Sequence, residues 1–142
     1  MKRYIGTKII HAEPRAKDYG PTDQQGQPGY TVVYPDGYTS WSPAAAFEDA
    51  YRQCDAMPFG LALEALKKGL KVGRSGWNGK GMWLALIAGE NWGIGGHAPY
   101  DTPGAAHINH LPFIGMKTAD DKFVPWLASQ TDMLADDWSI VE

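Results

Sequence analysis

The sequence predicts an α+β fold in which a compact antiparallel β-sheet carries a few short helices. The strongest observation is a hairpin: the β-rich runs Tyr30–Tyr34 and Tyr38–Trp41 flank Pro35-Asp36-Gly37, a sequence typical of tight turns. The second observation is that apolar residues recur at helical spacing over two short stretches only, 42–53 and 58–68. Short strands and short helices in this order favour α+β architecture.

Length and composition limit the class of protein. The 142 residues, 44% of them hydrophobic, fit one medium domain or two very small ones. No run approaches the roughly 18 apolar residues that span a bilayer, and charges near the N-terminus argue against a signal peptide. The net charge of −3 disfavours a general nucleic-acid binder. The single cysteine, Cys54, excludes an intrachain disulfide and fits a reducing cytosol.

The N-terminal third reads as a strand, a hairpin and a helix. We expect a strand over about Lys8–Ala12, then a mobile loop over 14–29 that is rich in Gly, Pro and Gln. After the hairpin, Ser42 is placed to cap a helix with Pro43 at its first position, ending near Gln53. A boundary near Asp55 divides a 1–55 extension from a larger 56–142 domain.

The larger domain begins with a helix. Pro58 opens it, one apolar stripe runs along it, and Gly69 is the expected left-handed stop. A short strand over Leu70–Arg74 and an apolar, central strand over Met82–Ile87 follow.

The remaining chain alternates loops and strands. Residues 88–109 form a long irregular insertion, which we expect to be ordered because it contains Trp92 and Tyr100. Strands are predicted at 110–116, at 123–127 and at 138–141. Pro125 places the second of these at a sheet edge or marks a bulge, and a short helix capped by Ser129 or Thr131 precedes the last.

The loop Arg74–Trp83 is the first candidate binding site. Trp77 offers a flat stacking face and Asn78 an amide for polar edges, between glycines that expose backbone N–H groups. Alternatively, Trp77 belongs to the core and Asn-Gly is a turn dipeptide. The second candidate, Pro125–Asp132, sets an aromatic ring beside polar side chains at a helix start, and ordinary helix capping is its alternative.

The sequence offers little support for a metal site, a glycine-rich phosphate loop or an acid–base pair. His97, His107 and His110 are better interpreted as hydrogen-bonding residues than as metal ligands, and Gly93–Gly96 fits neither nucleotide-binding glycine motif. Paired carboxylates at 120–121 and 136–137 read as solvated turns. We therefore predict no catalytic residue, metal or cofactor.

Two long blocks resemble the phage Thoeris anti-defence protein 2 family. The first joins Pro58–Gly69 to Arg74–Met82, and the second runs from Met116 to Trp138. Together they cover 57–142 apart from the insertion. Asp120-Asp121 stands where Asp-Gly is expected. The extension, from Tyr4 to Pro43, resembles a small module of other phage proteins, with no function implied.

This resemblance implies a non-catalytic sponge in the cytoplasm of the infected bacterial host. Such proteins bind the cyclic ADP-ribose-type signal made by TIR enzymes, glycocyclic ADP-ribose included, and some relatives hold cyclic dinucleotides at a separate site. They form homo-oligomers, typically tetramers, with pockets between subunits. No membrane or nucleic-acid polymer is implied as a partner. The implied ligand-binding residues are Phe59, Arg74, Trp77, Asn78, Gly81, Met82, Trp126, Ala128, Ser129, Gln130, Thr131 and Asp132.

The sequence also allows two other functions. A nucleotide-cleaving enzyme would use an acidic residue such as Asp132 as its base. A structural or interaction module of a phage particle would account for the N-terminal unit and the aromatic content.

Overall fold

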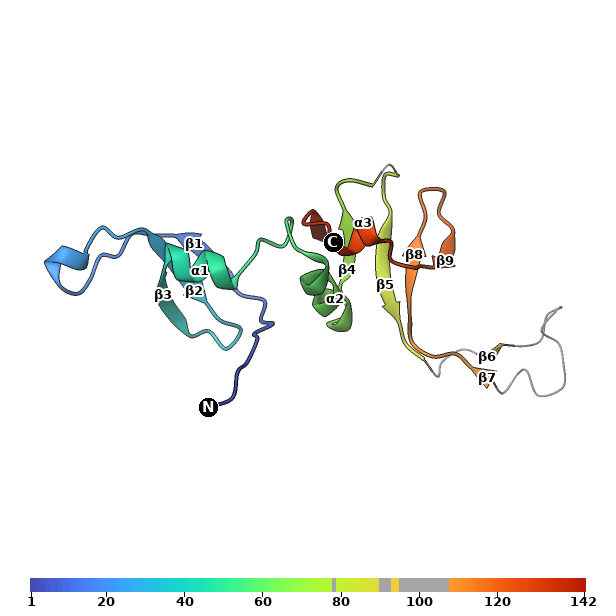
Figure 1. Cartoon of the computed structure of the whole chain (residues 1–142), viewed down its shortest axis with the longest axis horizontal. Coiled ribbons are helices and arrows are strands. Elements are labelled where there is room, and N and C mark those ends of the chain that lie inside the picture. Colours follow the sequence, from blue (N-terminus) through green and yellow to red (C-terminus); the bar gives the residue numbers. More distant parts are fainter. Residues whose placement is uncertain (78, 90–92, 95–107) are drawn as a thin grey trace. The chain divides into compact units, whose positions relative to one another are not determined.

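A computed structural model describes residues 1–77, 79–89, 93–94 and 108–142. The chain divides into unit 1, Met1–Gln53, and unit 2, Cys54–Glu142. Each unit combines antiparallel strands with short helices, which confirms the predicted α+β class (Figure 1).

Unit 1 is a three-stranded antiparallel sheet with one helix. Its strands are β1 (His11–Pro14), β2 (Gly29–Val33) and β3 (Thr39–Pro43), in the order β1-β2-β3. The short 3-10 helix η1 (Thr22–Gln24) lies in the long connection, and α1 (Ala44–Ala50) follows β3. The predicted hairpin is confirmed, since Tyr34 N–H donates to the Tyr38 carbonyl across the turn.

Three boundaries of unit 1 were predicted wrongly. The first strand begins at His11 rather than Lys8. The helix ends at Ala50 rather than near Gln53, and it begins later than predicted because Ser42 and Pro43 still pair with Tyr30 and Gly29 in the sheet. Ser42 therefore does not cap α1, which starts after Pro43 without a side-chain cap.

The two faces of this sheet differ. On one face Val32 is buried, and Tyr30 stacks on Phe47 of α1 at 4.1 Å between ring centroids. Phe47 stacks in turn on Tyr51 at 5.0 Å. On the opposite face, Thr31 pairs with Trp41. A Cβ on Gly29 would lie 2.3 Å from the Trp41 ring, so only glycine allows that ring to lie against the strand.

Unit 2 is built on a five-stranded antiparallel sheet with the order β10-β4-β5-β8-β9. The strands are β4 (Lys71–Arg74), β5 (Trp83–Ile87), β8 (Phe113–Lys117), β9 (Phe123–Pro125) and β10 (Trp138–Val141). A further pair, β6 (Gly93–Ile94) with β7 (Ile108–Asn109), forms a separate two-stranded ribbon. The predicted 110–116 strand corresponds to β8, which begins later, at Phe113, and the predicted central position of β5 is confirmed.

The helix α2 (Phe59–Lys67) covers one face of this sheet and closes the core (Figure 1). Ala62, Ala65 and Leu66 of α2 are buried against the strands. The remaining members of the buried cluster are Met57, Val72, Leu84 and Trp138. Gly69 has φ +84°, and the N–H groups of Gly69 and Leu70 donate to the carbonyls of Leu66 and Ala65. This is a Schellman cap, as the glycine predicted.

At the far edge, β9 is the edge strand that Pro125 indicated. Phe123 lies across Gly115 of the neighbouring strand, where a Cβ would be 2.0 Å from the ring. The hairpin before it turns at Asp121, which has φ +60°, a backbone region that favours glycine. Asp121, which stands where the family resemblance leads us to expect glycine, therefore has a backbone conformation that glycine adopts with less strain.

Candidate ligand-binding site

Four aromatic rings gather beside α2 and form what we call the aromatic cluster: Phe59, Trp77, Trp126 and Trp138. Trp77 meets the rings of Trp138 and Trp126 edge-on, at 5.4 Å and 6.4 Å between centroids. Trp138 is fully buried, whereas the other three rings are half-buried. Trp77 therefore packs against the core, and part of its surface remains accessible.

Asp132 joins this cluster to the start of α3 (Gln130–Met133). Its Oδ1 accepts from Arg74 Nη1 at 2.8 Å and from Trp77 Nε1 at 3.2 Å. Its Oδ2 accepts from the Ser129 hydroxyl at 2.7 Å and the Ser129 backbone N–H at 3.2 Å, while the Asp132 N–H donates to Ser129 Oγ. Ser129 and Asp132 form a capping box, so the capping interpretation of this segment holds.

Asp137 anchors the loop that carries Trp77. Its carboxylate accepts from Arg74 Nε at 2.8 Å, from the Gly76 N–H at 2.7 Å and from the Ser75 hydroxyl at 3.2 Å. The prediction that Asp137 is a solvated turn residue is wrong. It failed because the partners lie more than 60 positions away along the chain, where no local pattern can reveal them.

Arg74 is held between the two carboxylates. Its side chain is 13% exposed, and it forms ion pairs with Asp132 and Asp137, both at 2.8 Å. The hydrogen bonds that Arg74 donates to Asp137 and Asp132 raise the pKa of Arg74 above its usual value. Two of its nitrogens are thus committed within the protein, and its charge is balanced locally.

The carboxylates remain ionised under all ordinary conditions. Burial opposes the charge on Asp132, but hydrogen bonds from Ser129, Arg74 and Trp77 outweigh it and lower its pKa to about 2. The Arg74 hydrogen bond likewise lowers the pKa of Asp137. A carboxylate with so low a pKa is a weak proton acceptor at neutral pH, which disfavours Asp132 as a general base.

The structure brings together six of the residues implied by sequence: Phe59, Arg74, Trp77, Trp126, Ser129 and Asp132. Beside them, Gln130 and Thr131 are exposed on α3, and Ala128 is half-buried. The side chains of Gln130 and Thr131 are therefore accessible to a ligand.

Gly81 and Met82 have other neighbours. The Gly81 carbonyl accepts from Lys117 Nζ at 3.2 Å, and Met82 lies against Gly79, which in turn faces Ala119. Asn78, Trp92, Tyr100, His97 and His107 lie outside the described residues.

A metal site would need several histidine, cysteine or carboxylate side chains close together. His110 has its Nδ1 2.8 Å from the Leu111 carbonyl and its ring edge-on to Phe113. Across the described residues, no group of three or more His, Cys, Asp or Glu side chains is arranged to hold a metal ion. Nor does any helix in the described ranges have the length and apolarity to cross a membrane.

Sequence comparison identifies the family. Residues 57–141 match the model of the Thoeris anti-defense 2-like domain. The chain belongs to this family. It is also 46% identical, over 89 residues, to "Thoeris anti-defense 2" of Bacillus phage SP01, a match that covers 60% of this chain and 94% of that relative. Membership assigns the chain an anti-defence role, and the matched region coincides with the part of unit 2 that holds the aromatic cluster.

Proposed function

We propose that unit 2 binds a cyclic nucleotide immune signal of the cyclic ADP-ribose type and sequesters it without cleaving it. Glycocyclic ADP-ribose made by TIR enzymes is the expected ligand, and the host cytoplasm is the expected place of action. The observation that carries the proposal is the aromatic cluster beside the capped start of α3, in a chain of this family. Cyclic dinucleotides are a second ligand class to test.

The geometry suits a nucleotide that is held rather than converted. Half-buried rings of Phe59, Trp77 and Trp126 offer apolar faces and edges to an adenine, a contact worth about 1–3 kcal/mol per base. Gln130 and Thr131 offer hydrogen bonds to ribose hydroxyls or phosphate oxygens. Rings fixed by packing lose little entropy on binding, which favours the slow release that sequestration requires.

Arg74, one of the residues that the resemblance implies for ligand binding, has a positioning role in this proposal. Because both carboxylates engage its guanidinium, Arg74 positions Trp77 and α3 and does not face the diphosphate. Phosphate recognition then falls to neutral donors, namely side chains of α3 and backbone N–H groups. Neutral donors bind a phosphate without burying another charge.

We also propose that unit 2 assembles into a homo-oligomer, a tetramer by the family resemblance. One observation supports self-association: the face of the sheet opposite α2 is largely apolar, and no helix in the described part of unit 2 covers it. The apolar residues of this face are Trp83, Ala85, Ile87, Phe113, Phe123 and Val141. Sedimentation velocity of the full chain tests it, and a monomer would contradict it.

The sequestration test uses the full chain and purified glycocyclic ADP-ribose. Protein is incubated with ligand, separated from free ligand, denatured by heat and extracted. Recovery of intact ligand in a fixed ratio to protein supports the proposal. Recovery of a hydrolysed product, above one equivalent per chain, would instead indicate an enzyme. An absence of bound nucleotide, with no heat of binding, would indicate an interaction module.

A matched pair of substitutions locates the site. Thr131→Val removes an exposed hydroxyl with little change in shape, and we expect about a tenfold weaker affinity, the value of one or two lost hydrogen bonds. Thr7→Val makes the same change in unit 1 and should leave affinity unchanged. Trp77 is a poor choice for this test, because its ring packs against the core and its truncation would also disturb the fold.

A further inference from the structure

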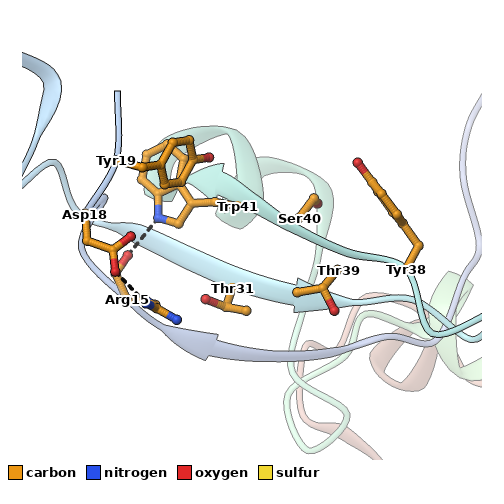
Figure 2. Close-up of a pocket in the computed structure, with 8 residues that line it drawn as sticks. All are labelled: Arg15, Asp18, Tyr19, Thr31, Tyr38, Thr39, Ser40 and Trp41. Atoms are coloured by element: carbon orange, nitrogen blue, oxygen red, sulfur yellow. Dashed lines mark hydrogen bonds and ion pairs between the residues drawn. The ribbon is translucent and has the colours of Figure 1, made fainter. Parts of the chain in front are cut away.

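A groove of about 550 Å³ lies in unit 1, and nothing in the proposed function uses it. It runs along the sheet face opposite α1, where Thr31 and Trp41 lie (Figure 2). The lining residues come from the end of β1, the long connection after it, and the β2–β3 hairpin. They are Arg15, Asp18, Tyr19, Thr31, Tyr38, Thr39, Ser40 and Trp41.

One wall of the groove is aromatic and fixed in position. Trp41 Nε1 donates to the Arg15 carbonyl at 2.8 Å, and its ring lies against Gly29. Tyr19 meets the Trp41 ring edge-on, with centroids 6.5 Å apart. Lys17 Nζ lies 5.3 Å from the Tyr19 centroid and 5.5 Å from the Trp41 centroid. Figure 2 shows the two rings side by side, with the Trp41 indole bonded to Arg15.

The two charged side chains that line the groove neutralise each other, and Lys17 Nζ beside the rings donates to Gln24 Oε1 at 2.9 Å. Arg15 Nη2 and Asp18 Oδ2 form an ion pair at 2.5 Å. An anion would have to compete with Asp18 for the guanidinium, and a cation would have to compete with Arg15 for the carboxylate. The groove is thus better matched to a ligand without net charge.

Hydroxyl groups also line the face that carries Trp41. Tyr19, Thr31 and Thr39 supply them, whereas Ser40 pairs with Val32 and its side chain belongs to the opposite face. In the part of the chain that the structure describes, none of these hydroxyls bonds to another protein group, so each is able both to donate and to accept. Tyr38 marks the other end of the groove (Figure 2), and its 65% exposed ring stacks on Tyr34 at 5.8 Å between centroids.

We propose that this groove binds a neutral saccharide. Sugar hydroxyls donate and accept as the lining hydroxyls do, and the apolar C–H face of a pyranose packs against aromatic rings. A peptide ligand is less suited, because grooves that bind extended peptides offer fixed N–H donors to peptide carbonyls. The indole N–H of Trp41 is already bonded to Arg15.

The test is a titration of the ¹⁵N-labelled full chain with maltotriose, cellotriose and triacetylchitotriose, each to about 10 mM, the range of weak sugar affinities. We expect saturable amide shifts around Thr31, Thr39 and Trp41 with at least one sugar. A Thr31→Val/Thr39→Val variant keeps two β-branched side chains in the strands but removes their hydroxyls. It should bind about tenfold more weakly, as expected for two lost hydrogen bonds.

A Thr7→Val/Thr22→Val variant is the matched control, because both residues are exposed and lie outside the groove. It should titrate like the parent chain. The proposal is overturned if none of the three sugars produces saturable shifts at the groove. It is also overturned if the Thr31/Thr39 variant binds as tightly as the control.

Discussion

Unit 2 buries a continuous cluster of apolar side chains between α2 and its sheet, whereas Val32 is the one buried hydrophobic residue among those described in unit 1. Unit 1 relies instead on stacked rings, such as Tyr30 on Phe47, that stay partly accessible. The difference shows two ways of stabilising short strands. A closed core supports a partly buried ion-pair network, while an open sheet leaves a face free for a groove.

The largest change in the free energy of unfolding is expected when one buried side chain is truncated in each unit. Leu66→Ala removes a fully buried side chain of unit 2 and should cost about 2–5 kcal/mol, since a cavity is left behind. Val32→Ala in unit 1 should cost about 1–2 kcal/mol, because fewer methyl groups are lost. Urea denaturation of the full chain, with NMR probes in each unit, measures both. The comparison fails if Val32→Ala proves the costlier change.

The next test removes Arg74, the cation of the partly buried ion-pair network in unit 2. Arg74→Met keeps an unbranched side chain but leaves Asp132 and Asp137 without their ion pairs, at a cost of about 2–4 kcal/mol. Arg15→Met in unit 1 breaks an exposed pair, which water screens, and should cost clearly less than Arg74→Met. Equal costs, measured by denaturation, would show that the unit 2 network is no better shielded from water.

A third test uses pH. Because the pKa of Asp132 is about 2 in the folded chain, below its usual value of 3.8, its stabilising effect is complete above about pH 4. It is lost as pH falls through about 2, and the loss is on the order of 2 kcal/mol. In Asp132→Asn this pH dependence should be weaker. Acid denaturation of both proteins checks the prediction, and parallel curves would refute it.

The smallest effects are expected at two glycines, Gly60 inside α2 and Gly69 just after its end. Gly60 lies inside α2 with open space where a Cβ would project, so Gly60→Ala should stabilise unit 2 by about 0.5 kcal/mol. Gly69 also has space but a φ of +84°, so Gly69→Ala should destabilise it by about 1 kcal/mol. Thermal melts resolve the two signs. If both variants are stabilised, the Schellman cap tolerates a side chain.

Local features of the fold were predictable from sequence because their causes are local. The end of α2 follows from Gly69, the edge position of β9 from Pro125, and the cap of α3 from Ser129. The start of α1 was misplaced for the opposite reason. Ser42 and Pro43 have helix-start chemistry, but pairing with β2 keeps them in the sheet.

The candidate site was predictable only in part. Its aromatic and polar residues were identified from their types and from the family resemblance. The hydrogen bonds from Arg74 and Trp77 to Asp132 could not be identified in this way, because the two donors lie 58 and 55 positions from Asp132 along the chain. Sequence periodicity reports on one element at a time, so contacts between elements, such as Trp77 on Trp138, need the fold.

The aromatic cluster also has a spectroscopic consequence. Three of the six tryptophans, Trp77, Trp126 and Trp138, lie within 6.4 Å of one another between ring centroids, at fixed edge-on angles. Indoles held so close couple electronically, and they should give near-ultraviolet circular dichroism bands that the unfolded chain lacks. A nucleotide seated against them would alter those bands and quench their emission. The wild-type chain therefore carries its own optical reporter of occupancy, at the place where the ligand is proposed to sit.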